Sequence, residues 1–204
     1  MYIIGLRGNF GSGKTTVGEM LAQHGAVVID ADAVGHGLLA KDSPAYTELL
    51  QIFGQEILLP DGGIDRRKLG KLAFKSDRST ARLNGVMRPK IRQELDCIIE
   101  RQRHMGTQVL VLEAALLVKS HWEGTMHEMW VTSAAQDVVL QRLKARRGYD
   151  AEEVLSRLQR QLSPEQMLEQ ADVVINTGCS LDELSRRVAE EWNRLQGRIH
   201  QRDC

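Results

Sequence analysis

The sequence has no excess of charge of either sign, because 27 lysine and arginine residues balance 27 aspartate and glutamate residues. Proteins that recruit nucleic acid by charge carry a positive surplus that attracts phosphate groups. The balance therefore gives no support for a nucleic-acid partner, and we expect none.

Cysteine is also scarce. Cys97, Cys179 and Cys204 are odd in number, far apart in the chain and without metal-ligand spacing. Such thiols are typical of a reducing compartment and do not suggest a disulfide framework. The first residues lack the basic and then apolar pattern of a signal peptide. We therefore expect a cytoplasmic protein.

The chain contains no long hydrophobic run. The longest one, Val109 to Val118, is about half of the roughly 20 residues that a membrane helix requires, and it includes Glu113. This run predicts a buried strand and the loop after it, and we expect no membrane association. The 204 residues, 42% hydrophobic and 26% charged, suit one globular domain over 1–204, since domains commonly hold roughly 100 to 200 residues.

Short apolar runs alternate with longer amphipathic segments along the chain. This alternation predicts an α/β fold with a parallel five-stranded sheet flanked by helices. The expected strands are residues 2–6, 26–29, 109–113, 128–132 and 172–175, and the expected helices are residues 15–23, 134–146, 151–162 and 181–195.

The second and third strands are too far apart for a single crossover helix. The core is therefore predicted over 1–42 and 106–204, with a helical subdomain inserted at about 43–105. The sequence LLPDGGIDRR at 58–67 marks a turn in the insertion, and Pro89 is expected to begin a new helix. The helical stripes in the insertion are formed by Leu69, Leu72 and Ala73, and by Leu83, Val86, Ile91, Leu95 and Ile98.

Residues 8 to 15 read GNFGSGKT and match the pattern G-x-x-x-x-G-K-[ST] completely, after a strand and before a helix. In such a P-loop the backbone N–H groups and the helix N-terminus bind phosphate. Lys14 is suited to the β- and γ-phosphates and Thr15 to Mg²⁺. The pattern predicts a P-loop NTPase-like fold that binds a nucleoside triphosphate through Gly8, Gly11, Ser12, Gly13, Lys14, Thr15 and Thr16.

The class of P-loop protein follows from other residues. Asp32-Ala33-Val34-Gly35 matches a GTPase switch, but no N-K-x-D guanine motif follows. The strand that would end in Asp in a motor ends in Glu113, which is also able to order Mg²⁺ or a water, and the chain is short for a motor. These observations leave a small-molecule kinase as the favoured class.

A kinase needs a carboxylate that orients the acceptor hydroxyl and accepts its proton. Asp30 and Asp32 directly follow the second strand, so one is predicted to face the acceptor while the other supports Mg²⁺ or a helix N-terminus. Two plain helix caps are the alternative.

Arginines are concentrated after the fourth strand. Arg142 and Arg146 lie four residues apart on one helix face, and a lid is predicted at about 142–162 that closes over the triphosphate. The alternative is a solvated surface on which these arginines pair with neighbouring glutamates.

With these residues in view, the chain resembles the dephospho-coenzyme A kinases. The resemblance rests on GLRGNFGSGKTTV (5–17), VIDADAVGHGLL (28–39), SPAY (43–46), FGQEILLPDGGIDRRKLGKLAF (53–74), RLKARRG (142–148) and ADVVINTG (171–178). It implies transfer of the γ-phosphoryl of ATP to the ribose 3′-hydroxyl of dephospho-coenzyme A, with Mg²⁺, in a monomer or small homo-oligomer.

The resemblance also implies residue roles. Asp32 would be the base, which contacts the acceptor and also supports Mg²⁺, directly or through water. Lys14 and Arg142 would act on the transferring phosphoryl group, and Arg146 would also contact ATP. The insertion would bind coenzyme A. The expected acceptor-binding residues are Asp32, His36, Arg88, Glu113 and Leu116. His36 as a plain polar residue on a short helix is the alternative.

The chain departs from the family pattern at several acceptor-region positions. The usual His-Pro is Arg88-Pro89, an aromatic-Glu pair is Val118-Lys119, and a basic residue is replaced by Met167. Three readings follow: an active dephospho-coenzyme A kinase, a related kinase with another hydroxyl acceptor, or a non-catalytic nucleotide-binding regulatory protein.

Overall fold

The structure is a computed structural model, and it describes residues 1–114, 124–147, 161 and 163–202. The chain divides into two compact units. The first comprises Met1–Asp30 with Met105–Cys204, and the second comprises Ala31–His104. The second unit contains most of the predicted insertion but begins earlier, at Ala31, because the short helix α2 (Ala31–Gly37) packs on helix α5 (Asp77–His104).

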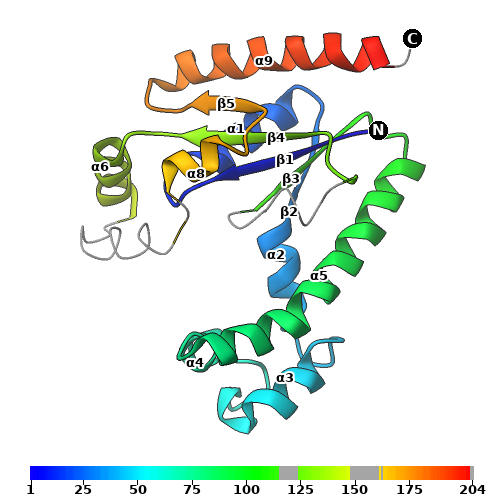
Figure 1. Ribbon diagram of the computed structural model, residues 1–204, viewed down its shortest axis with the longest axis vertical. Coiled ribbons are helices and arrows are strands. Elements are labelled where there is room, and N and C mark those ends of the chain that lie inside the picture. Colours follow the sequence, from blue (N-terminus) through cyan, green and yellow to red (C-terminus); the bar gives the residue numbers. More distant parts are fainter. Residues whose placement is uncertain (115–123, 148–160, 162, 203–204) are drawn as a thin grey trace. The chain divides into compact units, whose positions relative to one another are not determined.

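The first unit is built on a parallel sheet of five strands (Figure 1). Its strands are β1 (Tyr2–Gly8), β2 (Val27–Asp30), β3 (Val109–Glu113), β4 (Glu128–Ser133) and β5 (Val173–Asn176), in the spatial order β2-β3-β1-β4-β5. The predicted α/β fold and its five strands are confirmed, with small differences at the strand ends. β1 lies in the centre and pairs with β3 and β4.

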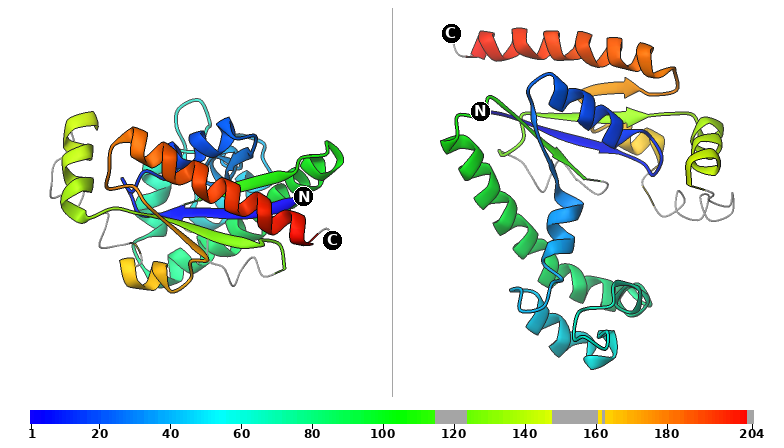
Figure 2. Two further views of the ribbon diagram at one scale, coloured as in Figure 1. Left: turned by 90° about the horizontal axis from the view of Figure 1, so that it is seen from above. Right: turned by 180° about the vertical axis from the view of Figure 1, so that it is seen from behind.

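Two helices of the first unit share a core with one face of the sheet. Alternate residues of β1, namely Tyr2, Ile4 and Leu6, pack with residues of α1 (Lys14–Gln23) and α9 (Leu181–Arg202). The other face of β1 is therefore lined by the residues between them. The view from above in Figure 2 shows α1, in blue, and the short helix α8 (Pro164–Leu168), in yellow, on opposite sides of β1.

Helix α6 (Gln136–Arg147) follows β4 and packs next to the loop after β1. Its residues Val139 and Leu143 are buried and form a small apolar cluster with Phe10 of that loop. A Cβ added at Gly11 would lie 2.7 Å from Val139 and 2.9 Å from Leu143. Glycine is therefore required at position 11 by close packing as well as by its positive φ of 77°.

The second unit has its own hydrophobic core. Helix α3 (Tyr46–Phe53), the 3₁₀ turn η1 (Gln55–Ile57), α4 (Arg66–Ala73) and α5 surround it. The predicted turn is present: Leu59 N–H donates to Gly63 O at 2.8 Å, and Gly62 has a positive φ of 84°. Asp65 then caps α4 by accepting from the N–H groups of Arg67 and Lys68. The buried residues of this core are Leu38, Ala45, Leu49, Ile57, Ile64, Leu69 and Val86.

The expectation that Pro89 begins a new helix is wrong, because α5 is one helix that passes through it. Proline removes one backbone hydrogen bond and crowds the preceding turn. Buried residues on both sides of it, Val86 before and Leu95 and Ile99 after, keep the helix packed.

In the part of the chain that the structure describes, no helix is long and apolar enough to cross a membrane.

Candidate active site

The phosphate loop joins β1 to α1, and its first glycine fits against β4. A Cβ at Gly8 would lie 2.0 Å from Thr132 Oγ1 and 2.3 Å from Ser12 Oγ, so no larger residue is accommodated without displacement. The two hydroxyl groups are themselves hydrogen-bonded at 2.7 Å. Ser12 N–H donates to Asn9 O at 2.9 Å. Ser12, which was predicted to contact ATP, therefore uses its hydroxyl and its N–H within the protein.

The N-terminus of α1 is open to an anion. Its N-cap residue is Gly13, in a left-handed conformation with φ 84°, and the first turn, which contains Lys14, Thr15 and Thr16, has no acidic residue. The leading N–H groups of a helix lack intrahelical partners, and its N-terminus carries a partial positive charge. The loop and helix together form the arrangement that binds phosphate groups.

Glu113 brings the end of β3 to the phosphate loop. Its Oε1 accepts from Lys14 Nζ at 2.5 Å and from Thr15 Oγ1 at 2.8 Å. The side chain is buried and lies on the α1 face, since a Cβ at Gly18 would come within 3.0 Å of Glu113 Oε2. A hydroxyl and a carboxylate side by side are oxygen ligands of the kind that magnesium prefers. The structure thus unites three predicted residues, Lys14, Thr15 and Glu113.

Arg142 extends from α6 to the loop between β5 and α9. Its Nη2 donates to Thr177 O at 2.5 Å and to Cys179 O at 3.3 Å, and its Nη1 donates to Thr177 Oγ1 at 3.3 Å. Thr177 Oγ1 in turn donates to Ser12 O at 2.7 Å. Thr177 therefore connects Arg142 to the phosphate loop through two hydrogen bonds.

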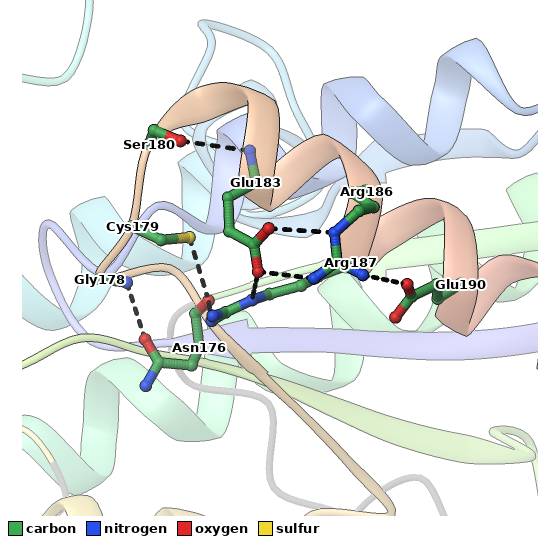
Figure 3. A network of polar contacts seen from close by, with 8 residues as sticks. All are labelled: Asn176, Gly178, Cys179, Ser180, Glu183, Arg186, Arg187 and Glu190. Carbon is green, nitrogen blue, oxygen red and sulfur yellow. Dashed lines mark hydrogen bonds and ion pairs between the residues drawn. The ribbon is translucent and has the colours of Figure 1, made fainter.

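A second network of polar contacts holds the same β5–α9 loop from the side of α9 (Figure 3). Arg187 Nη1 donates to Asn176 O at 3.0 Å, and Asn176 Oδ1 accepts from Gly178 N at 2.8 Å. Glu183 accepts from both Arg186 and Arg187, which lowers its pKa to about 2. The loop that carries Thr177 is thus fastened to the first turns of α9.

The predicted acceptor residues of the second unit lie on α2 and α5. The strand β2 ends at Asp30 and α2 begins at Ala31, so Asp32 is in the first turn of a helix and is half-buried. His36, in the last turn of α2, contacts Arg66 Nη2 through Nε2 at 2.6 Å. Because a guanidinium only donates, His36 Nε2 is the acceptor. Arg88 is exposed on α5.

Part of the predicted site lies outside the described residues. This holds for the expected acceptor residue Leu116, for the departures Val118 and Lys119, for most of the predicted lid and for the helix expected at 151–162. Arg146 lies on α6, but its side chain is also outside the description. Met167 is 4% exposed on α8.

Sequence reasoning missed Thr132 and Thr177, which support the phosphate loop from β4 and from the β5–α9 loop. Both are fully buried. The sequence does show a threonine at or just after the end of each of two predicted strands. The strand order, which the sequence does not give, is what places Thr132 and Thr177 beside the phosphate loop. In the described residues, no group of three or more His, Cys, Asp or Glu side chains is arranged to hold a metal.

Comparison with known proteins gives one consistent family. A sequence model of dephospho-CoA kinase matches residues 2–183. A dephospho-CoA kinase from Corynebacterium diphtheriae is 37% identical over 199 residues, with 98% of this chain and 100% of that protein covered. One from Dehalococcoides mccartyi is 36% identical over 184 residues, with 90% and 92% covered.

A solved structure is similar over the same length. A crystal structure of a Thermus thermophilus protein has a TM-score of 0.80 and 32% identity, and the match covers 95% of this chain and 97% of that one. The family model, over residues 2–183, includes the phosphate loop, the five strands and the second unit. The chain therefore belongs to the dephospho-CoA kinase family, whose members catalyse the last step of coenzyme A biosynthesis.

Proposed function

We propose that the protein transfers the γ-phosphoryl group of ATP to the ribose 3′-hydroxyl of dephospho-coenzyme A, giving coenzyme A and ADP. The observation that carries this proposal is the cluster of Lys14, Thr15 and Glu113 at a phosphate loop in a chain of this family. The cluster supplies a cation, a hydroxyl and a carboxylate where a triphosphate would bind.

Lys14 supplies positive charge to the β- and γ-phosphates. Its ammonium group is bound to Glu113 at 2.5 Å, so a triphosphate oxygen replaces a carboxylate oxygen that is already in place. The N–H groups at the start of α1 would bind phosphate oxygens beside Lys14. These donors are fixed by the fold, and their stabilisation of the negative charge that develops during transfer requires little reorganisation.

Thr15 and Glu113 fit the requirements of a magnesium ion. Magnesium usually takes one or two protein oxygen ligands and completes its shell with phosphate oxygens and water. When bound, it would neutralise charge on the β- and γ-phosphates. Thr15 Oγ1 and the Glu113 carboxylate would hold it, and Asp32 is a further candidate through water.

Asp32 is the proposed base for the acceptor. The 3′-hydroxyl oxygen attacks the γ-phosphorus, the bond from that phosphorus to the β,γ-bridging oxygen breaks, and the hydroxyl proton passes to the Asp32 carboxylate. The residues proposed to contact the acceptor are His36, Arg88 and Leu116, and the predicted insertion is proposed to bind its coenzyme A portion.

We also propose a cytoplasmic location, because Cys97 and Cys179 are free thiols.

Arg142 is the proposed second cation, with Arg146 beside it in sequence. Its guanidinium donates to carbonyl oxygens of the β5–α9 loop, and a guanidinium has five N–H donors, so some remain for phosphate oxygens. The predicted lid would exclude water from the transferring phosphoryl group.

The test is acceptor-dependent release of ADP from ATP by the purified protein. Dephospho-coenzyme A should support turnover with much higher kcat/KM than adenosine or other hydroxyl compounds, and the product should carry the phosphate on the 3′ oxygen. Preference for another hydroxyl acceptor would show a related kinase of different specificity. Tight ATP binding without acceptor-dependent ADP release would show a regulatory nucleotide-binding protein.

A further inference from the structure

Arg7 is a buried guanidinium that has no counter-charge among the described residues. It occupies the penultimate position of β1 and is 2% exposed. Its Nη1 donates to the neutral Gln170 Oε1 at 3.1 Å, whereas its buried Nε has no hydrogen-bond partner. Among the described residues, no carboxylate forms an ion pair with it. Burial lowers the pKa of Arg7 below its usual value.

Such an arrangement is unfavourable for the protein alone. Removing a charge from water has a large free-energy cost, and buried arginines are normally paired with carboxylates and fully hydrogen-bonded. Arginine also keeps its charge at physiological pH. The unsatisfied N–H group of Arg7 is therefore suited to an anionic oxygen of a ligand, for which a planar guanidinium has favourable geometry.

The face of the sheet on which Arg7 lies indicates which of the two substrates carries the anionic group. Leu6 and Ile4 of β1 pack towards α1 and α9, so the adjacent Arg7 lies on the opposite face, where it contacts Gln170 just after α8. Lys14, Thr15 and Glu113 belong to the α1 face. The triphosphate already has these partners and the start of α1, so Arg7 remains for an anionic group of the other substrate.

We propose that Arg7 binds the pyrophosphate diester of dephospho-coenzyme A and thereby contributes to recognition of the acceptor. This inference rests on the proposed function, because it requires dephospho-coenzyme A as the acceptor. The diester is anionic at neutral pH, whereas adenosine, which has the same 3′-hydroxyl, carries no charge. Arg7 therefore favours the nucleotide acceptor over the nucleoside.

The test compares Arg7→Met, Arg7→Lys and the wild-type protein. Arg7→Met keeps the length of the side chain and removes the charge. Its KM for dephospho-coenzyme A should rise about 10- to 100-fold, the range that corresponds to hydrogen bonds of a charged group. Its KM for ATP and its weak use of adenosine should stay within about twofold. Arg7→Lys should fall between the two, because an ammonium keeps the charge without the planar fork.

Two controls separate binding from folding. Arg194→Met removes an exposed guanidinium that pairs with Glu191, and it should leave both KM values unchanged. The melting temperature of Arg7→Met without substrates should be unchanged or higher, because an uncompensated buried charge has been removed. A melting temperature several degrees lower, with losses for both substrates, would assign Arg7 a structural role and overturn the proposal.

The remaining outcomes are also decisive. If the wild-type protein phosphorylates dephospho-coenzyme A and Arg7→Met has the same KM for it, the role of Arg7 is wrong and the proposed function stands. An increase in the KM for ATP that matches the increase for dephospho-coenzyme A would place the anion on the donor and overturn the proposal. If the wild-type protein does not use dephospho-coenzyme A at all, the proposed function itself fails, before any variant is made.

Discussion

The ammonium group of Lys14 has a carboxylate partner within the protein, so a triphosphate competes with Glu113 for it. The pair is only slightly exposed, with 15% of the Lys14 side chain and 8% of the Glu113 side chain accessible to solvent. A buried charge that loses its partner is costly. The pair therefore keeps each group in position. It also limits what Lys14 contributes to ATP binding, because the gain is only the difference between the interaction free energy of Lys14 with phosphate and that with Glu113.

Replacement of Lys14 by methionine should lower turnover roughly a hundredfold or more, because charge stabilisation in the transition state is lost. It should also destabilise the folded protein, since the buried Glu113 loses its charged partner and keeps the hydrogen bond from Thr15. Steady-state kinetics and urea unfolding measure the two effects. Lys14→Arg should restore much of the stability and little of the turnover. Wild-type turnover in Lys14→Met would exclude the proposed role.

The proposed base predicts a different signature for Asp32→Asn. This change keeps the size of the side chain and removes its charge, and it should lower kcat roughly a hundredfold or more. The ATP affinity measured by calorimetry should change little. Asp182→Asn, on the exposed first turn of α9, provides the matched control and should have wild-type activity. Near-normal turnover of Asp32→Asn would remove Asp32 from the mechanism.

At the scale of single residues, the sequence predicted that the phosphate loop lies between a strand and a helix, because a contiguous motif determines its geometry. It named Lys14, Thr15 and Glu113, which the structure brings together. It did not predict that Ser12 hydrogen-bonds Thr132, or that Arg7 is buried with no counter-charge in the part of the chain that the structure describes. Those properties depend on which strands are neighbours and on which face each residue lies, and one sequence contains little information on either.

Among the elements, α9 is connected to the sheet by a buried carboxylate. Glu128, at the start of β4, accepts from Arg198 of α9 at 2.7 and 3.0 Å, from Tyr2 of β1 at 2.8 Å and from Trp130 at 2.7 Å. Desolvation raises the pKa of Glu128, but these donors outweigh it, so the pKa lies below its usual value. One ionised carboxylate thus holds a helix and two strands together.

This network predicts a pH dependence of stability. Because the folded pKa of Glu128 is lowered, its contribution is fully present above the unfolded value of 4.5 and is lost as the pH falls through the folded value. Glu128→Gln should lower the free energy of unfolding by about 1–3 kcal/mol at pH 7, and the difference from wild type should shrink below about pH 4.5. Urea unfolding at pH 7 and pH 3.5 measures it.

The same network acts at the alkaline end. Burial, followed by the hydrogen bond to Glu128, raises the pKa of Tyr2 to about 12. Its contribution is present below pH 10 and is lost as the pH rises through about 12.

The control for Glu128→Gln is Glu190→Gln, which breaks an exposed ion pair with Arg186 and should have little effect on stability at any pH. An equal loss in Glu128→Gln at pH 7 and pH 3.5 would contradict the assignment.

Whole elements were easier to predict than their ends or their continuity. The five strands followed from apolar runs of the correct length, and α9 followed from its apolar spacing but continues to Arg202. Pro89 was misleading because the local rule for proline was outweighed by tertiary packing of α5 on both sides of it.

For the whole molecule, nucleotide binding should appear as thermal stability. ATP at about 100 times its Kd should stabilise the protein by about 2.7 kcal/mol, which corresponds to a rise in melting temperature of about 5–10 °C for a chain of this size. The rise should be much smaller in Lys14→Met and normal in Asp32→Asn. Differential scanning calorimetry with and without ATP measures it, and equal rises in all three proteins would show that the nucleotide does not use Lys14.

The central place of β1 in the sheet has a consequence for synthesis of the chain. The phosphate loop is encoded within the first 15 residues, yet β1 pairs only with β3 (Val109–Glu113) and β4 (Glu128–Ser133). A growing polypeptide therefore carries the complete loop sequence long before the strands that shape it have been translated. Because domains generally fold as units, a nascent chain is expected to acquire its affinity for nucleotide late, after Ser133 has emerged from the ribosome.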